Sequence, residues 1–208
     1  HACFMLKSKT KKLIFDPFKR IGLQEPDAKA DIILCSHIHS DHNNAAAVSH
    51  GRSIILQGFT GMARIGSVSV KGIATFHDEV QGSKRGKNSI YLVGLDDLSF
   101  CHLGDLGHKL SASQANEIRP VDVLFLPVGG FYTIGPEEAR KVMKSLKPKV
   151  TVPMHYKLPG MSDAFSQLST VEDFICREDD VKRLKTASFT VSRENLPKKA
   201  SIVIAKLG

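Results

Sequence analysis

Short apolar runs separated by polar turns mark the strands predicted in the first half of the chain. Ala2–Leu6 and Leu13–Phe15 lie on either side of a polar stretch, which predicts a hairpin. Asp31–Cys35 is an apolar run without alternation, typical of a strand buried on both faces. The alanine-rich segment Asn43–His50 predicts a short helix, and Gln81–Lys87 predicts an exposed basic loop. Four more strands are predicted at Ser53–Gln57, Ser67–Ile73, Ser89–Val93 and Leu98–His102.

Strands and helices alternate more plainly in the second half. A helix is predicted over Ser111–Ile118, where Gln114 stands at the spacing of a capping box. Another is predicted over Pro136–Lys147, because proline favours the first helical position and the apolar residues recur at helical spacing. Thr170–Arg177 predicts a third helix, and strands are predicted at Val121–Leu126, Val150–Met154 and Ser201–Ala205. We therefore expect a single α/β domain over residues 1–208.

Composition and charge narrow the class of protein. Apolar residues make up 42% and charged residues 24% of the chain, which is typical of a globular domain and excludes a disordered chain or a fibre. No stretch approaches eighteen uninterrupted apolar residues, so we expect no membrane span. The formal net charge of +8 favours anionic partners, although a solvated basic surface gives the same excess. Four widely spaced cysteines without a C-x-x-C pair predict reduced thiols in the cytoplasm.

Three histidines and an aspartate follow the predicted strand Asp31–Cys35 within six positions. Because residues two apart in an extended chain point the same way, His37 and His39 can bind one cation. Asp41 and His42, where the chain turns, can face a second cation. Imidazole and carboxylate ligands together suit zinc, with manganese and iron as alternatives. The competing interpretation is a solvated histidine-rich loop.

A metal site needs ligands from more than one loop, and His77, Asp105 and His155 each follow a predicted strand. Ligand sites in α/β proteins lie beyond the carboxyl ends of strands. Gly104 before Asp105 allows a close backbone approach there. A single histidine at a strand end is more often an ordinary surface or core group. Together, in this order, the three residues predict one shared site.

The order of these residues resembles the motif set of the metallo-β-lactamase superfamily. Flanking segments sharpen the resemblance to the UlaG-type metal-dependent hydrolases, which are compact relatives of ascorbate-phosphate lactonase. The resemblance extends from His1 to about Tyr156. The matching segments are His37-x-His39-x-Asp41-His42, His77, Gly104-Asp105 and His155, flanked by His1-Ala2, Asp16-Pro17-Phe18, Leu126–Gly130 and Pro153–Tyr156.

This resemblance implies a four-layer αββα sandwich with two divalent metal ions in the cleft between its sheets. Histidine at position 39, where redox-active iron relatives carry glutamate, favours a zinc-like hydrolytic site. Leu106 departs from the pattern, because serine or threonine usually follows the bridging aspartate. By position, His37, His39 and His77 would hold the first ion, Asp41, His42 and His155 the second, and Asp105 would bridge them.

The implied mechanism uses a water between the two cations, whose pKa falls towards ~7. Asp41 would orient this water and take up its proton. His102 or His108 would protonate the leaving group, unless these two histidines only support the ligands. If the family's first strand has been cut away before His1, this residue would support the ligands or face the substrate. As a true terminus, it would be frayed.

The substrate is less constrained than the site. We expect a small ester, lactone or phosphodiester, with the oligomeric state left open. Lys84, Arg85 and Lys87 would attract a phosphate or simply form a solvated loop tip. One alternative is a nuclease or RNA-processing hydrolase, which the charge favours but which lacks interleaved aromatic and basic residues for stacking bases. The other alternative is a non-catalytic metal-binding module. All seven expected ligand positions are filled, which argues against it.

Overall fold

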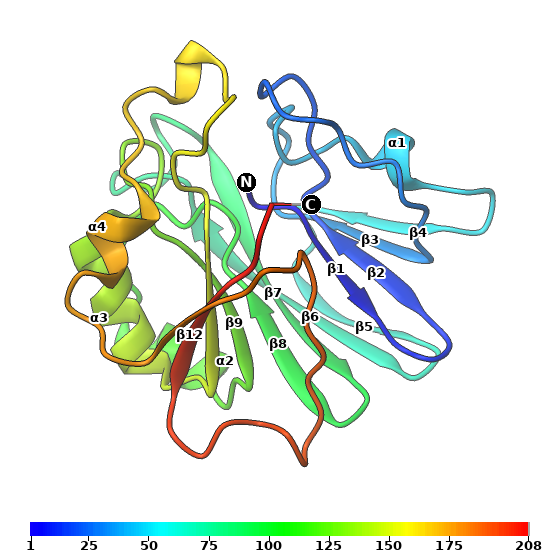
Figure 1. Cartoon of the computed structure of the whole chain (residues 1–208). Coiled ribbons are helices and arrows are strands. Elements are labelled where there is room, and N and C mark those ends of the chain that lie inside the picture. Colours follow the sequence, from blue (N-terminus) through cyan, green and yellow to red (C-terminus); the bar gives the residue numbers. More distant parts are fainter. Residues whose placement is uncertain (208) are drawn as a thin grey trace.

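The strands of the chain form two sheets that pack face to face in the computed structural model, which describes residues 1–207 (Figure 1). The smaller sheet has the order β1-β2-β3-β4 and the larger the order β11-β12-β10-β9-β8-β7-β6-β5. The smaller sheet contains β1 (Phe4–Lys7), β2 (Lys12–Phe15), β3 (Ile32–Cys35) and β4 (Ile54–Gln57). The larger contains β5 (Gly61–Ile65), β6 (Val68–Phe76), β7 (Lys87–Leu95), β8 (Leu98–His102), β9 (Val123–Pro127), β10 (Val150–Met154), β11 (Val181–Arg183) and β12 (Ser201–Ile204).

Apolar side chains from both sheets meet in one core. β1 and β2 form the expected antiparallel hairpin, and β3 lies parallel between β2 and β4 with all four of its residues buried. The smaller sheet contributes Phe15 and Leu34, and the larger contributes Tyr91 and Phe125. Full burial of an aliphatic or aromatic side chain stabilises a fold by roughly 1.5–3 kcal/mol. This shared interior therefore fixes how the two sheets face each other.

Helices cover the outer faces of the sheets, which confirms the αββα arrangement (Figure 1). α2 (Ala112–Ile118), α3 (Pro136–Leu146) and α4 (Val171–Ile175) pack on the larger sheet. Ser111 and Gln114 form the expected capping box at α2. The smaller sheet carries only α1 (Ala45–Val48), so the fourth layer is a single helical turn. α1 is shorter than the predicted Asn43–His50, because the backbone angles of Asn44 and Ser49 on either side of it are not helical.

Three elements escaped the sequence prediction: β5, β11 and the short 3-10 helix η1 (Asp163–Phe165). β5 and β11 are the two edges of the larger sheet, and their residues are mostly exposed, so neither shows a clear apolar pattern. β6 and β7 also run further than predicted, because their paired ends reach Phe76 and Lys87. The predicted exposed loop at Gln81–Lys87 therefore ends one residue earlier than expected.

The candidate site residues follow directly on strand ends. His37 comes just after β3, His77 just after β6, Asp105 shortly after β8 and His155 just after β10. The carboxyl ends of neighbouring strands are where α/β proteins bind ligands. Within residues 1–207, no helix is both long and apolar enough to cross a membrane.

Candidate metal centre

The loop after β3 folds back on itself and turns three of its polar side chains inwards. The backbone N–H of His42 donates to the carbonyl of His39 at 2.9 Å, which closes a tight turn. His37 and His42 are buried, Asp41 is partly buried, and His39 is exposed. The loop thus presents two buried imidazoles and one more open imidazole at the same end of the sandwich.

Asp105 lies at the centre of the candidate site and is itself buried. Its Oδ2 is 3.0 Å from Nε2 of His77, 3.1 Å from Nε2 of His42, 3.2 Å from Nε2 of His155 and 3.9 Å from Nε2 of His37. One carboxylate oxygen is therefore surrounded by four ring nitrogens from three separate stretches of the fold.

The backbone before Asp105 requires a glycine. Gly104 has φ +54°, and a Cβ at this position would lie 2.3 Å from Oδ1 of Asn88 and 2.6 Å from the Ser36 side chain. The same Asn88 oxygen accepts the backbone N–H of Asp105 at 2.9 Å. Close packing of this turn against Ser36 and Asn88 therefore aims the Asp105 carboxylate at the histidines.

The potential ligands fall into two groups that share no residue, and a third group, His37, His42 and Asp105, links them. Within each group, one ligand atom per residue lies within 4.8 Å of all the others. Six of the nine histidines belong to this assembly, while His50, His102 and His108 lie outside it. We call the first group, His37, His39 and His77, the open cluster, and the second group, His1, Asp41, His42 and His155, the closed cluster.

The donor atoms fit divalent cations. Within residues 1–207, Nε2 of His37, His42 and His155 and Oδ1 of Asp105 are buried without a hydrogen-bond partner. Such orphaned polar atoms are costly unless something else occupies them. Two ligands about 2.05 Å from one tetrahedral zinc ion lie roughly 3.3 Å apart. The observed 3.0–3.2 Å separations around Oδ2 of Asp105 are close to that value.

A buried carboxylate behind the ligands fixes two of the imidazoles. Oδ2 of Asp16 accepts from Nδ1 of His42 at 2.8 Å and from the Ser36 hydroxyl at 2.7 Å. Oδ1 accepts the Ser36 backbone N–H at 2.7 Å. The Ser36 oxygen in turn lies 2.9 Å from Nδ1 of His37. Both rings therefore engage Nδ1 away from the centre and point Nε2 into it, as metal-binding histidines do.

Electrostatics in the metal-free protein separates these two histidines. Burial lowers the pKa of His37 to about 3, and the positive charge of His42 pushes it in the same direction. Burial also acts to lower the pKa of His42, but the carboxylates of Asp105 and Asp16 outweigh it and raise that pKa well above 6.5. For Asp105, burial opposes ionisation, yet His155, His42 and His77 hold its pKa well below 3.8. A cation is thus already favoured among these carboxylates.

His102 and His108 are not brought to the cluster. His102 is fully buried and stacks on Phe15, with ring centres 4.7 Å apart. Its Nε2 lies 2.9 Å from the carbonyl of Ala2, and its Nδ1 accepts from Gly104. His108 bonds to backbone atoms of Phe76 and Lys109. These contacts give both rings structural partners, so the proton-donor role remains a sequence prediction without geometric support.

A cavity of about 310 Å³ opens beside the open cluster. His39, Asp41, His77 and Asp105 form its polar wall. The opposite rim carries cationic and aromatic side chains from other loops, together with Ser162 and Ala164. These side chains are Lys19, Arg20, Arg85, Tyr132 and Phe165. The cavity therefore joins the candidate ligands to a positively charged rim.

The loop that carries Arg85 is organised around one carboxylate. Asp78 accepts four backbone N–H groups, from Val80, Gly82, Lys84 and Arg85, at 2.8–3.0 Å. Burial acts to raise the pKa of Asp78, but these four bonds outweigh it and lower the pKa. The predicted solvated loop tip is therefore a folded turn.

Within that turn, Arg85 is half-buried and lies over the aromatic wall of the cavity. Its guanidinium carbon is 4.7 Å from the Tyr132 ring centre, and Nη2 donates to the Phe131 carbonyl at 3.3 Å. The Tyr132 hydroxyl donates to the Ala164 carbonyl at 2.7 Å. Of the three basic residues predicted in this loop, Arg85 is the one that lines the cavity.

Comparison with known proteins identifies the family. The sequence model of the β-lactamase superfamily domain matches residues 1–155, about three quarters of the chain. The chain belongs to the metallo-β-lactamase superfamily. This confirms the resemblance suggested by the ordered histidine and aspartate motifs; the narrower UlaG-type assignment is compatible with the match.

Similar proteins of this superfamily have been described as hydrolases. The chain is 33% identical over 186 residues to a metal-dependent hydrolase of Archaeoglobus fulgidus, covering 75% of this chain and 80% of the relative. It is 31% identical over 183 residues to one of Thermococcus kodakarensis, covering 75% and 81%. A crystal structure of a candidate Zn-dependent hydrolase from Thermotoga maritima superposes with a TM-score of 0.78 at 34% identity, covering 99% and 94%. The chain is a metal-dependent hydrolase of the metallo-β-lactamase superfamily.

The sequence analysis grouped most of these residues, but it left the place of His1 open and gave Asp16 no role. His1 is part of the closed cluster, with a fully buried side chain, and is not frayed. Asp16 was quoted only as a family segment, whereas the structure makes it the anchor of His42 and Ser36. Its φ of 41°, which aspartate tolerates better than most residues, gave no signal in the sequence pattern.

Proposed function

We propose that the open and closed clusters bind two divalent cations, which are zinc ions, and that Asp105 bridges them. His37, His39 and His77 hold the first ion, and Asp41, His42 and His155 hold the second. The observation that carries this proposal is the set of buried Nε2 atoms on His37, His42 and His155 that have no hydrogen-bond partner in the described chain. Three imidazoles and one carboxylate at the first position, and two imidazoles and two carboxylates at the second, match the ligand chemistry of zinc.

Two zinc ions supply nucleophilic hydroxide at neutral pH and polarise the oxygen of the bond that is attacked. The protein's own groups then orient the reactants. Asp41 lines the cavity and stays ionised, because hydrogen bonding and charge from His42 outweigh its burial and lower its pKa. Its carboxylate orients the attacking water and accepts the proton. The Tyr132 and Phe165 rings narrow the cavity and limit the water that enters it.

The cationic rim supports an anionic small molecule as the substrate. Lys19, Arg20 and Arg85 line the cavity, and within residues 1–207 none of them lies in an ion pair with a carboxylate. A cavity of about 310 Å³ has the size of a small-ligand site. We therefore infer that the substrate is a small ester, lactone or phosphodiester that carries a negative charge, which Arg85 binds over the Tyr132 ring.

Metal analysis and a substrate panel test this function on one preparation. We expect two metal equivalents per chain by mass spectrometry and hydrolysis of anionic esters, lactones or phosphodiesters in preference to neutral analogues. Arg85→Ala should raise KM for the anionic substrate about 10–100-fold, since a hydrogen bond to a charged group is worth about 1.5–3 kcal/mol. It should leave the metal content and the neutral substrate unchanged.

The exposed Arg52 provides the matched control, and Arg52→Ala should leave KM unaltered. A metal-free preparation that cannot be reconstituted would contradict the proposed function. RNA cleavage that weakens steeply with added salt would instead identify the nuclease alternative. If Arg85→Ala raised KM equally for neutral and anionic substrates, Arg85 would not recognise the negative charge of the substrate.

A further inference from the structure

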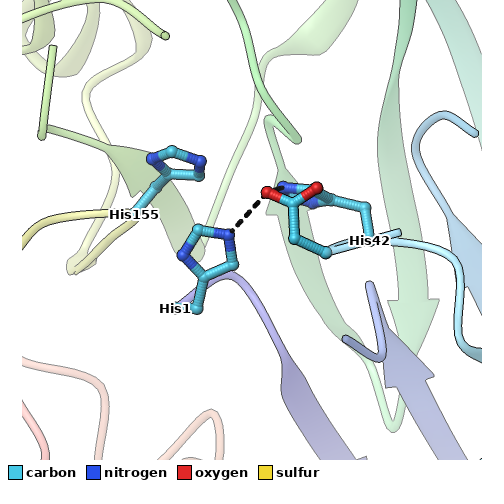
Figure 2. Close-up of side chains that lie close together, drawn as sticks. His1, His42 and His155 are labelled. Carbon is cyan, nitrogen blue, oxygen red and sulfur yellow. Dashed lines mark hydrogen bonds and ion pairs between the residues drawn. The ribbon is translucent and has the colours of Figure 1, made fainter. Parts of the chain in front are cut away.

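His1 is the member of the closed cluster that the proposed ligand set leaves unused. Its side chain is fully buried. Figure 2 shows its ring directed towards His42 and His155. The ring also contacts the carboxylate of Asp41. The ring centres of His1 and His155 are 4.2 Å apart, and those of His1 and His42 are 5.1 Å apart.

The surroundings of His1 hold the ring in this place. The edges of Phe18 and Phe165 pack against it, with ring centres 6.4 and 5.3 Å away. The His1 carbonyl accepts the backbone N–H of His155 at 3.3 Å, so the two residues are also tied through the main chain. An imidazole that is sealed between apolar rings needs a polar partner on its open side.

The side of the His1 ring that is not covered by phenylalanine faces the potential ligand atoms of Asp41, His42 and His155. Its Nε2 lies 3.3 Å from Oδ2 of Asp41, and Nε2 of His42 lies 3.5 Å from the same oxygen. One nitrogen or oxygen from each of His1, Asp41, His42 and His155 lies within 4.8 Å of all the others. Two ligands about 2.05 Å from one ion lie roughly 2.9–3.3 Å apart for angles of about 90–109°, so a separation of 3.3 Å allows His1 and Asp41 to share one ion.

We propose that His1 is a further protein ligand of the second cation, beside Asp41, His42 and His155. This inference rests on the proposed dinuclear site. With Asp105 as the bridge, the open cluster then supplies four protein ligands and the closed cluster five. Four ligands complete a tetrahedral zinc site, whereas five give the second zinc ion a higher coordination number. The two positions therefore differ in coordination number.

Two substitutions separate a ligand from a hydrogen-bond donor. His1→Gln keeps an N–H group at a similar reach from the backbone, so it can still donate to Asp41, but an amide is a poor ligand for these ions. His1→Ala removes both functions. Each variant, and the wild type, is made metal-free, without a polyhistidine tag, and titrated with Co²⁺. The measurements are the equivalents retained, the affinity of each step and the visible absorption of the bound ion.

We expect the wild type to bind two Co²⁺ ions with different absorption spectra. Both variants should bind the ion of the closed cluster at least about 100-fold more weakly, because loss of a ligand exceeds the 10–100-fold typical of an outer hydrogen-bond partner. The ion of the open cluster should keep its affinity and spectrum. His50→Ala, which removes a histidine outside both clusters, should behave as the wild type.

Wild-type affinity for both ions in His1→Gln would overturn the proposal and leave His1 as a hydrogen-bond donor that positions Asp41. Unchanged metal affinity in His1→Ala, or an equal loss of affinity for both ions, would also overturn the proposal. A wild type that binds no metal at all would instead refute the proposed function, so the two failures are distinguishable.

Discussion

The open and closed clusters share Asp105 but differ in their surroundings. His39 of the open cluster is exposed, and His39 and His77 both line the cavity. In the closed cluster His42 is fully buried and is held by Asp16, and neither His42 nor His155 lines the cavity. Outer partners that fix a ligand raise metal affinity. We therefore expect the closed cluster to bind its proposed ion more tightly than the open cluster, which is more accessible from the cavity.

The largest expected effect removes the group that both clusters share. Asp105→Ala should abolish binding of both ions and lower hydrolysis by at least about 1000-fold, since metal activation of water and substrate supplies several kcal/mol. Metal content by mass spectrometry and kcat/KM measure this. Asp179→Ala, at an exposed aspartate, is the control. Retention of one full equivalent in Asp105→Ala would show that the clusters are independent sites.

A smaller effect should fall on the closed cluster alone. Asp16→Asn preserves size and tolerates the positive φ at this position, but it removes the charge that anchors His42. The affinity for the ion of the closed cluster should fall about 10–100-fold. The first ion should change less, because His37 contacts Asp16 only through Ser36. Competition with a metal-sensitive dye measures the affinity for each ion. An equal loss of affinity for both ions would contradict the proposed difference between the clusters.

The smallest effect concerns the stability of the metal-free protein as a function of pH. The raised pKa of His42 means that its proton stabilises the fold fully below pH 6.5, and that this contribution is lost as the pH rises through the folded pKa. We therefore expect the Tm of the metal-free protein to fall as the pH rises above neutrality. In the metal-loaded protein a cation replaces that proton, so its Tm should fall less. Scanning calorimetry of both forms measures this, and parallel curves would contradict it.

Much of the fold could be predicted because its central strands are apolar on both faces. The runs that became β3, β8 and β10 were placed within a residue, and the capping box located α2. The edge strands β5 and β11 could not be found, since mostly exposed strands lack a hydrophobic pattern. The end of β6 was placed too early, because its last residues, up to Phe76, are defined by pairing with the start of β7 at Lys87.

The candidate site shows the same limit. His37, His39, Asp41 and His42 could be grouped because they are neighbours in the chain, and strand ends suggested the rest. His1 gave no such signal, because its burial depends on Phe18 and Phe165, which reach it only in the folded molecule. The role of Asp16 could not be predicted for a related reason. Asp16 reaches His42 and Ser36 only because the carboxyl ends of β2 and β3 lie side by side.

Arg85 was one of three basic residues that looked alike in sequence. The fold distinguishes it, because Asp78 gathers the backbone of this turn and directs Arg85 over Tyr132. Lys84 remains exposed, and Lys87 starts β7. Charge composition favoured an anionic partner, and the folded turn identifies Arg85 as the side chain proposed to bind it.

The turn built on Asp78 also separates two tasks that many enzymes combine. Arg85 at its tip lines the cavity, while the histidines follow the ends of strands. Randomised libraries over residues 79–86 could therefore alter selectivity without disturbing catalysis itself, provided that Asp78 is kept. Directed evolution of new specificities on this scaffold has a natural starting point there.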